Sequence, residues 1–402
     1  MEPIRKVDVI RAGWLSIPIG PSQTMNRIIR NKDIFLGRGY DIRVFSSDIV
    51  SPREDGRSVS LKGRIKSKAA TFLKRLGRYS STASELCIKR SLYANASRLI
   101  KYYTTHSRNP DIIVFHDFFS CHCFLKHTDT CAKTILFYHN NGLMFDSLLY
   151  YYPKLGKSSY YQELLNAEQY VLSKVDKAVF VAEKGRENFL DAHIGFDVSK
   201  TLVIHNGIDD VVSWETGSGT AAHPKYRICY VGTFNLRKGQ DMALRALTCI
   251  PEEKLCDIHI SFIGDGDTRQ SLEKYAISNG LGKYVSFCGS VKNTEIHSVM
   301  CQHNIFMLVS YEEGLPISII EAMRAGLGII ASNVGGISEL VVHGENGVLI
   351  EPDGAQLLHV LENLFRYDWV AMGKASRKRF EKEFTFAKMR DSYISMLDNI
   401  CE

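Results

Sequence analysis

The stretch Ser310-Tyr311-Glu312-Glu313-Gly314-Leu315-Pro316-Ile317-Ser318-Ile319-Ile320-Glu321-Ala322-Met323 places two carboxylates eight residues apart around a Gly/Pro loop that opens a helix. Glu313 precedes the predicted helix, and Glu321 lies about one turn inside it. The free N–H groups at a helix start favour a phosphate or another anion. Carboxylates accept hydrogen bonds from hydroxyls, so the stretch suits a ligand with a central diphosphate and a polyol at each end, as in a nucleotide sugar. The alternative is an ordinary strand-to-helix turn with a capping glutamate.

Short β-branched runs alternate with longer amphipathic segments along the whole chain. This alternation predicts a doubly wound α/β architecture. The expected strands are 7–12, 42–46, 112–115, 134–138, 178–181, 202–204, 227–231, 258–263, 285–287, 305–309 and 328–331. The expected helices are 23–36, 84–105, 159–173, 183–190 and a last segment at 375–399 with Phe380, Phe384, Phe386 and Tyr393 as apolar anchors.

The length of the chain predicts two domains. At 402 residues the chain is too long for one ordinary core. Residues 214–224 form a Gly/Ser/Thr stretch that predicts a linker, and residues 51–80 are polar and basic, as in an insertion. With 45% hydrophobic and 23% charged residues, the composition is that of a soluble globular protein. We find no run of about 18 apolar residues and no apolar segment after the N-terminal charges, and therefore expect a cytoplasmic protein without a signal peptide or a membrane span.

Basic residues are concentrated in the first half of the chain. Residues 1–200 contain 31 Lys and Arg against 19 Asp and Glu, a net charge of +12, whereas the net charge of the whole chain is +6. The segment from Lys62 to Arg90 has nine bases and one acid, Glu85. Such a segment can bind an anionic membrane surface, which is the preferred interpretation, or it can be a solvated surface. Nucleic acid is disfavoured as a partner because aromatic residues are few here.

Two short patterns raise the question of a metal ion. Cys121-His122-Cys123 does not have the spacing of a common zinc finger, so reduced thiols in a cytosolic core are the preferred interpretation. Asp265-Gly266-Asp267 imitates the D-x-D of metal-dependent transferases. The alternative, which we favour, is a turn in which Asp267 is the N-cap of the next helix.

Several motifs together resemble one family, the retaining glycosyltransferases called group 1 or family 4. The pattern S-x-x-E-G-x-P-x-x-x-x-E-A-M-x-x-G runs from Ser310 to Gly326, and Val231–Gly239 resembles the glycine–basic–glycine phosphate loop of the family. The resemblance is strong from about residue 200 onward and weak before it. One departure is Thr233, where many members have an arginine; Arg237 can take over its role. The remaining matching segments are His205–Asp209, Ile263–Gly266, Phe287–Gly289, Gly335–Gly336 and Glu339.

The resemblance implies a GT-B fold, in which two Rossmann-like domains face a cleft. The expected domains are an acceptor domain at 1–205 and a donor domain at 206–380, with a C-terminal helix from about 380 to 402 that crosses back to the first domain. Ligands of such sheets bind at the carboxyl ends of the strands. Domain closure would exclude water, which otherwise hydrolyses the donor.

The resemblance also assigns roles in donor binding. Lys238 and Arg237 would hold the phosphates, Glu321 the ribose hydroxyls and Glu313 the transferred sugar. The catalytic group would then be Glu313, Lys238 and His116. Further donor-binding residues expected from the motifs are Thr233, Gly314, Leu315, Ile317 and Val291, the last near the base. No metal and no cofactor are expected, because the family has a similar glycine turn at 264–266 and needs no metal in its active site.

The acceptor side is predicted from residues of the first domain. His116 follows the strand 112–115, where the family often has a histidine close to the sugar. Gly20 belongs to a stretch that loosely matches the glycine loop of the family. His139 and Asn140 end another strand at the same edge. A half-buried histidine with only a structural role is the alternative for His116.

These observations predict a retaining hexosyltransferase that uses a nucleotide sugar, with UDP favoured over GDP. The acceptor would be a glycan or a lipid-linked sugar in cell-surface polysaccharide or lipopolysaccharide synthesis, made at the inner face of the plasma membrane. A nucleotide-sugar 2-epimerase of the same fold and a non-catalytic sugar-nucleotide binder are the alternatives. A dinucleotide-dependent oxidoreductase is disfavoured because Arg11-Ala12-Gly13-Trp14 follows the first strand instead of G-x-G-x-x-G.

Overall fold

The computed structural model describes residues 3–15, 17, 20–50, 72–211 and 224–400. These residues form two compact units. Unit 1 contains 1–181, 185–204 and 390–402, and unit 2 contains 182–184 and 205–389. The expected linker and most of the expected insertion at 51–80 lie outside the described residues.

Unit 1 is built on a parallel six-stranded sheet in the order β2-β1-β3-β4-β5-β6. The central strands β3, β4 and β5 are short apolar runs that are almost entirely buried, as expected for a parallel sheet covered on both faces, while the edge strand β6 is half-buried. The order reverses between β1 and β3, which therefore form the switch point of this sheet. The strands are β1 (Arg5–Arg11), β2 (Tyr40–Ser46), β3 (Ile112–Phe115), β4 (Lys133–Tyr138), β5 (Lys177–Phe180) and β6 (Thr201–Val203).

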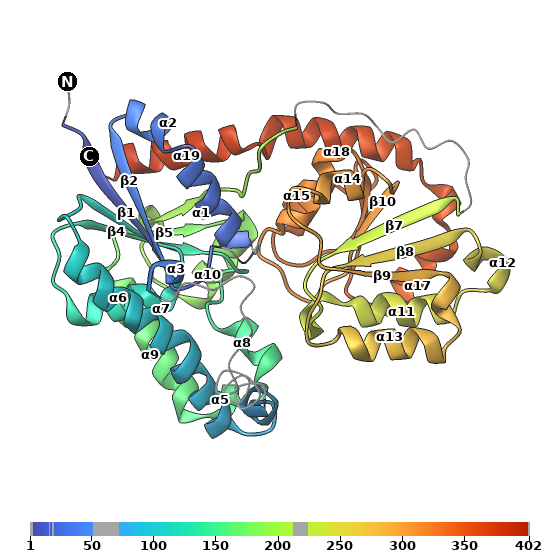
Figure 1. Ribbon diagram of the computed structural model, residues 1–402, viewed down its shortest axis with the longest axis horizontal. Helices are drawn as coiled ribbons and strands as arrows, with labels where there is room; N and C mark the ends of the chain where they lie inside the picture. The colour runs from blue at the N-terminus through green and yellow to red at the C-terminus, as the bar shows by residue number, and fades with distance from the viewer. Residues whose placement is uncertain (1–2, 16, 18–19, 51–71, 212–223, 401–402) are drawn as a thin grey trace. The chain divides into compact units, whose positions relative to one another are not determined.

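The helices of unit 1 cover this sheet and share its core. A cluster of buried aromatic and aliphatic side chains, with Phe115, Phe124 and Phe180 among its members, joins the sheet to α6, α7 and α9. These three helices run side by side in Figure 1. The helices are α1 (Gly20–Arg30), α2 (Lys32–Gly37), α3 (Ser47–Val50), α5 (Ser81–Ile88), α6 (Ala94–His106), α7 (Phe118–His127), α8 (Asp146–Tyr151), α9 (Ser159–Lys174) and α10 (Glu183–Ala192).

Unit 2 repeats the architecture with the sheet order β12-β11-β10-β7-β8-β9, again parallel throughout. Its switch point lies between β7 and β10. Figure 1 shows α11, α13 and α17 on one face of this sheet and α14, α15 and α18 on the other. The strands are β7 (Tyr226–Val231), β8 (Ile258–Ile263), β9 (Val285–Gly289), β10 (Ile305–Leu308), β11 (Gly328–Ser332) and β12 (Gly347–Ile350).

The chain ends with two long helices. The helices of unit 2 are α11 (Gln240–Thr248), α12 (Glu252–Leu255), α13 (Arg269–Ser278), α14 (Ile296–Met300), α15 (Ile317–Arg324), α16 (Ile337–Leu340), α17 (Gly354–Glu362) and α18 (Trp369–Glu383). The last helix, α19 (Phe386–Asn399), belongs to unit 1 from Arg390 onward. There Tyr393 packs against Phe35 and Phe137, with ring centroids 6.0 and 5.6 Å apart, so the expected return of the C-terminal helix to the first domain is confirmed.

Several sequence predictions about elements were incomplete. The helix expected at 375–399 is two helices, α18 and α19, separated at Phe384 and Thr385. The helix expected at 23–36 is divided, because the side-chain amide of Asn31 donates to the carbonyl of Arg27 and ends α1 (2.9 Å). The helix expected at 84–105 is interrupted by a π-helical segment, Lys89–Tyr93. The strand β12 and the helix α7 were not predicted, although α7 has an N-cap, Asp117, that accepts from the Ser120 N–H (2.8 Å).

Candidate functional site

The switch point of unit 2 brings together two segments that are distant in the sequence. The loop after β7 contains Arg237 and Lys238, and the loop after β10 contains Ser310 to Glu313. Because β7 and β10 are neighbours in the sheet, both loops leave the same edge. The backbone N–H of Tyr311 donates to the carbonyl of Arg237 (2.8 Å) and joins the loops directly.

Lys238 and Glu313 form the centre of this site. The Lys238 Nζ donates to Glu313 Oε1 at 2.6 Å, and the Ser310 hydroxyl donates to the same oxygen at 2.6 Å. Both charged side chains are largely buried. Burial alone would raise the pKa of Glu313, but Lys238, Arg237 and the hydrogen bonds to the carboxylate lower it overall. Glu313 is therefore a carboxylate at neutral pH.

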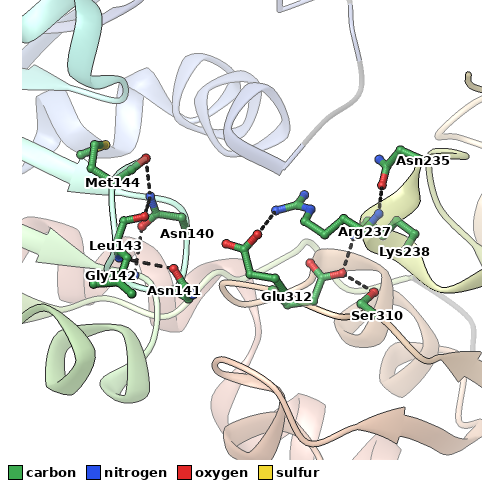
Figure 2. Close-up of polar contacts among 11 residues, drawn as sticks. Asn140, Asn141, Gly142, Leu143, Met144, Asn235, Arg237, Lys238, Ser310 and Glu312 are labelled. Carbon is green, nitrogen blue, oxygen red and sulfur yellow. Dashed lines mark hydrogen bonds and ion pairs between the residues drawn. The ribbon is translucent and has the colours of Figure 1, made fainter. Parts of the chain in front are cut away.

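A second, looser charge pair lies beside the first. Arg237 Nη1 is 3.5 Å from Glu312 Oε2, and the Arg237 N–H donates to the side chain of Asn235 (3.0 Å). Figure 2 shows Arg237 reaching Glu312 from one side while Asn235 holds its backbone from the other. The site thus contains two cations and two carboxylates, arranged as neighbouring pairs.

A glycine and a tyrosine fix the loop after β7 in place. Gly239 has φ +69°, and a Cβ at this position would lie 1.9 Å from the Val309 carbonyl oxygen, so only glycine fits. The hydroxyl of buried Tyr230 donates to the carbonyl of Lys238 and accepts from the Val309 N–H (3.1 Å). Sequence reasoning missed Tyr230; the available signal was a tyrosine on a buried strand, whose hydroxyl requires a partner.

The helix start that the sequence predicts is α15. Glu313 lies before it and Glu321 within it, as expected, and Gly314, Leu315 and Ile317 are buried at its beginning. Gly335, with φ +55°, lies so close that a Cβ there would be 1.8 Å from the Glu313 carbonyl oxygen. The Gly335–Gly336 pair therefore allows the chain after β11 to pack on the Glu313–Gly314 loop.

Not every predicted donor residue joins this cluster. Thr233 is exposed, and its carbonyl accepts from the side chain of Gln240 (3.1 Å). Val291 follows β9 and is half-buried. Glu321 is 7% exposed and interacts electrostatically with Arg324. The prediction that Asp267 is an N-cap is wrong: the cap of α13 is Thr268, whose side chain makes no capping hydrogen bond, while Asp267 is exposed.

In unit 1, His116 and His139 follow neighbouring strands and form a pair. His116 Nδ1 lies 2.8 Å from His139 Nε2, and the His116 ring stacks on Phe137. Burial first, and then the nearby charge of Arg11, lowers the pKa of His139 to about 3. Burial, His139 and Arg11 also lower the pKa of His116 well below its usual value. Both imidazoles are therefore neutral near pH 7.

The other two acceptor-side residues lie in a loop after β4 and at the start of α1. The Asn140 side chain folds its own turn, accepting from the Gly142 N–H (3.0 Å) and donating to the carbonyl of Leu143 (3.2 Å), as Figure 2 shows. Gly20 is the first residue of α1, while Pro18 and Ile19 lie outside the described residues. Across the residues described, no group of three or more His, Cys, Asp or Glu side chains could hold a metal ion.

The two units match known families and known folds. Residues 35–211 match the model described as Glycosyltransferase Family 4, and residues 217–369 match the model described as Glycosyl transferases group 1. Over 98% of the chain, the fold superposes on sucrose-phosphate synthase from Thermosynechococcus elongatus, covering 99% of that chain with a TM-score of 0.73 and 18% identity. The protein thus has the GT-B fold. It belongs to the group 1 glycosyl transferases of family 4.

Sequence relatives match over part of their length. The glycosyltransferase MJ1178 of Methanocaldococcus jannaschii is 26% identical over 222 residues, which are 55% of this chain and 58% of that protein. The amylovoran biosynthesis glycosyltransferase AmsK of Erwinia amylovora is 32% identical over 174 residues, 41% of this chain and 42% of its own. The chain spans about half the length of such curated relatives. A further structural neighbour is HepE of Anabaena in complex with UDP-glucose, with a TM-score of 0.67, 15% identity and coverage of 98% of this chain and 100% of that chain.

Proposed function

We propose that the protein is a retaining hexosyltransferase that takes a sugar from a nucleotide donor, with UDP as the nucleotide. The observation that carries the proposal is the Lys238–Glu313 pair beside the start of α15 at the switch point of unit 2. Cations and backbone N–H groups stabilise a diphosphate leaving group as its negative charge grows. The complex of HepE with UDP-glucose gives UDP priority among the nucleotides to test.

Each site residue has a proposed role. Lys238 and Arg237 hold the donor phosphates, with Thr233 and the N–H groups around Gly314, Leu315 and Ile317. Glu321 accepts from the ribose, Glu313 orients the transferred sugar, and Val291 lies next to the base. On the acceptor side, His116 contacts the sugar, and Gly20, His139 and Asn140 contact the acceptor. The proposed domains are an acceptor domain in residues 1–205, completed by the C-terminal helix, and a donor domain in 206–380.

In the proposed reaction, an acceptor hydroxyl attacks the anomeric carbon on the face from which the diphosphate departs. The bond between that carbon and the phosphate oxygen breaks, and the leaving phosphate receives the proton of the hydroxyl. Lys238 holds the negative charge that develops, which does not require a metal ion. Full activity in excess EDTA is the expected result, and loss of activity that Mg²⁺ or Mn²⁺ restores would contradict metal independence.

The experiment that tests the function measures nucleotide release. The protein is incubated with labelled UDP-glucose, UDP-GlcNAc and GDP-mannose, with and without a mixture of glycan acceptors. We expect acceptor-dependent release of UDP from one donor. An epimerase would change the sugar without releasing UDP in net turnover, a non-catalytic binder would bind without turnover, and either result would replace the proposed function.

We also propose a peripheral position on an anionic membrane for an enzyme of cell-surface polysaccharide or lipopolysaccharide synthesis. No described helix is both long enough and apolar enough to span a bilayer. Within the basic stretch from Lys62 to Arg90, the described bases Lys74, Arg75, Arg78, Lys89 and Arg90 are all exposed. Exposed Phe72 and Tyr79 lie next to them. Each base near an anionic surface contributes about 1 kcal/mol, so co-sedimentation with phosphatidylglycerol vesicles should fall steeply with salt, and its absence at low salt would contradict the proposal.

A further inference from the structure

The switch point of unit 1 contains a cation that the sequence analysis did not use. Arg11 is the last residue of β1, and His116 directly follows β3, the neighbouring strand. His139 follows β4, the next strand along. Three basic side chains thus leave three adjacent strands at the same edge of the sheet, where open α/β sheets bind their ligands.

The Arg11 side chain is held in position but lacks a carboxylate partner. Its Nη1 donates to the Ser22 hydroxyl (2.7 Å), and that hydroxyl donates to the carbonyl of Trp14 (3.0 Å). Gly13 makes room for the guanidinium, since a Cβ there would lie 2.4 Å from Nη1. Among the described residues, no carboxylate forms an ion pair with Arg11.

The acid whose charge acts on Arg11, Asp117, is already engaged elsewhere. Asp117 acts on Arg11 only through its charge. Its Oδ2 accepts from the Ala12 N–H (2.7 Å) and the Ser120 hydroxyl (2.7 Å), and its Oδ1 accepts from the Ser120 N–H (2.8 Å) as the cap of α7. The carboxylate is thus committed to the backbone, and moving it would uncap a helix.

His116, which is affected by the charge of Arg11, adds a buried atom without a hydrogen-bond partner. His116 is 2% exposed. Its Nδ1 is engaged with His139, but its Nε2 is buried without a hydrogen-bond partner in the described part of the chain. When His139 donates its Nε2–H to His116 Nδ1, the neutral His116 ring carries its proton on Nε2 and can donate it. A buried donor without a partner is costly unless a ligand completes it.

We propose that Arg11 and His116 form a subsite for an oxyanion, a carboxylate or a phosphate, carried by the acceptor. A planar guanidinium matches the two oxygens of either group, and the His116 Nε2–H supplies a further donor. Ser22 positions the guanidinium, and His139 sets the tautomer of His116. The inference rests on the proposed function, in which unit 1 binds the acceptor, and it narrows the acceptor to an acidic or phosphorylated sugar.

The test uses the full-length chain with ¹⁵N-labelled histidine. Inorganic phosphate and acetate are titrated separately at constant ionic strength, and the His116 Nε2 resonance, assigned by its loss in the His116→Gln variant, is followed. We expect a saturable shift with at least one anion. A saturable shift with phosphate alone would identify a phosphorylated acceptor, and one with acetate alone would identify a carboxylated acceptor. The absence of a saturable shift with either anion would overturn the proposal.

Variants and a competition experiment distinguish this subsite from nonspecific anion binding and from the donor site. Arg11→Gln should weaken the anion about tenfold or more, Ser22→Ala should weaken it severalfold, and the exposed Arg30→Gln should leave it unchanged. Arg11→Lys, which keeps the charge, should retain part of the binding if Arg11→Gln does not fold.

A competition experiment separates this subsite from the donor site. Saturating UDP should not abolish the shift caused by phosphate, and loss of that shift would assign the anion to the donor site instead. Because no turnover is measured, failure of the transferase assay leaves this result intact, and the reverse also holds.

Discussion

Glu313 in unit 2 and Glu168 in unit 1 are both buried glutamates, 4% and 3% exposed, but their pKa values move in opposite directions. Glu313 has Lys238 and Arg237 near it, and its pKa is lowered despite burial. Glu168 accepts from the Tyr138 hydroxyl at 3.1 Å and lies 3.9 Å from His193 Nε2, and burial, with a smaller contribution from the charge of Asp146, raises its pKa to about 7. The neighbours, more than the depth of burial, therefore decide which carboxylate keeps its charge.

The contrast extends to the two switch points. At the switch point of unit 2, the charged side chains form two ion pairs, Lys238–Glu313 and Arg237–Glu312. Unit 1 has a neutral histidine pair and a single arginine at the corresponding edge. In the proposed function, a ligand of unit 2 exchanges with existing ion-pair contacts, whereas a ligand of unit 1 adds a contact to the buried His116 Nε2.

The largest expected effect comes from removing a cation from unit 2. Lys238→Met leaves the Glu313 carboxylate buried without its main partner, which costs about 3–5 kcal/mol in the free energy of unfolding. The double variant Lys238→Met/Glu313→Gln should recover most of this stability but no activity. Urea unfolding measures the stability of the single and the double variant, with the exposed Lys254→Met as control, and nucleotide release measures their activity. Equal stability of Lys238→Met and wild type would show that the pair does not hold Glu313 in its charged form.

The next effect is a pH dependence from unit 1. The raised pKa of Glu168 means that the folded state binds its proton more tightly than the unfolded state, so this contribution to stability is present at low pH and is lost as pH rises toward 7. Because glutamine does not ionise, Glu168→Gln should not lose stability as the pH rises. Its free energy of unfolding should exceed that of wild type by ~2–3 kcal/mol at pH 8 and differ little from it at pH 4.5.

The matched control for that prediction is Glu163→Gln, an exposed glutamate on the same helix. Denaturant unfolding at a series of pH values compares the three proteins. A Glu168→Gln variant that parallels wild type across this range would mean that Glu168 is ionised in the folded protein.

The smallest expected effect tests the neutral pair. His139→Phe removes one hydrogen bond between uncharged rings, leaves the buried His116 Nδ1 without that partner and keeps an aromatic side chain near Phe137, so it should cost about 1–2 kcal/mol of stability. Thermal unfolding, with the exposed His127→Phe as control, compares this cost with that of Lys238→Met. A loss of stability as large as that of Lys238→Met would indicate that one imidazole of the His116–His139 pair is charged. It would contradict the contrast between a neutral pair in unit 1 and ion pairs in unit 2.

Much of the fold follows from local sequence patterns. The strands from β1 to β11 are runs of β-branched and aromatic residues between turns, and their positions were predicted within a few residues. The strand β12, Gly347–Ile350, was missed, although the equally short β3, the shorter β6 and the glycine-led β11 were predicted. In runs of three or four residues, periodicity alone does not separate a strand from a loop.

The sequence motifs identified the charged residues around Lys238 and Glu313, but not that these two side chains form an ion pair. The motifs identified Lys238 and Glu313, yet they are 75 residues apart, and only the pairing of β7 with β10 brings them together. Arg11 was read only as a departure from a dinucleotide motif. Its importance depends on Ser22, Gly13 and the commitment of Asp117 to a helix cap, and none of these relations can be derived from spacing alone.

The central claim is that unit 2 binds a nucleotide sugar with Glu321 on the ribose. Calorimetric titration of UDP into wild type, Glu321→Ala and the exposed control Glu345→Ala tests it most directly. A hydrogen bond to a charged group contributes about 1.5–3 kcal/mol, so Glu321→Ala should raise the Kd for UDP roughly 10- to 100-fold, while Glu345→Ala should match wild type. An unchanged Kd for Glu321→Ala, or no UDP binding by wild type, would contradict the account.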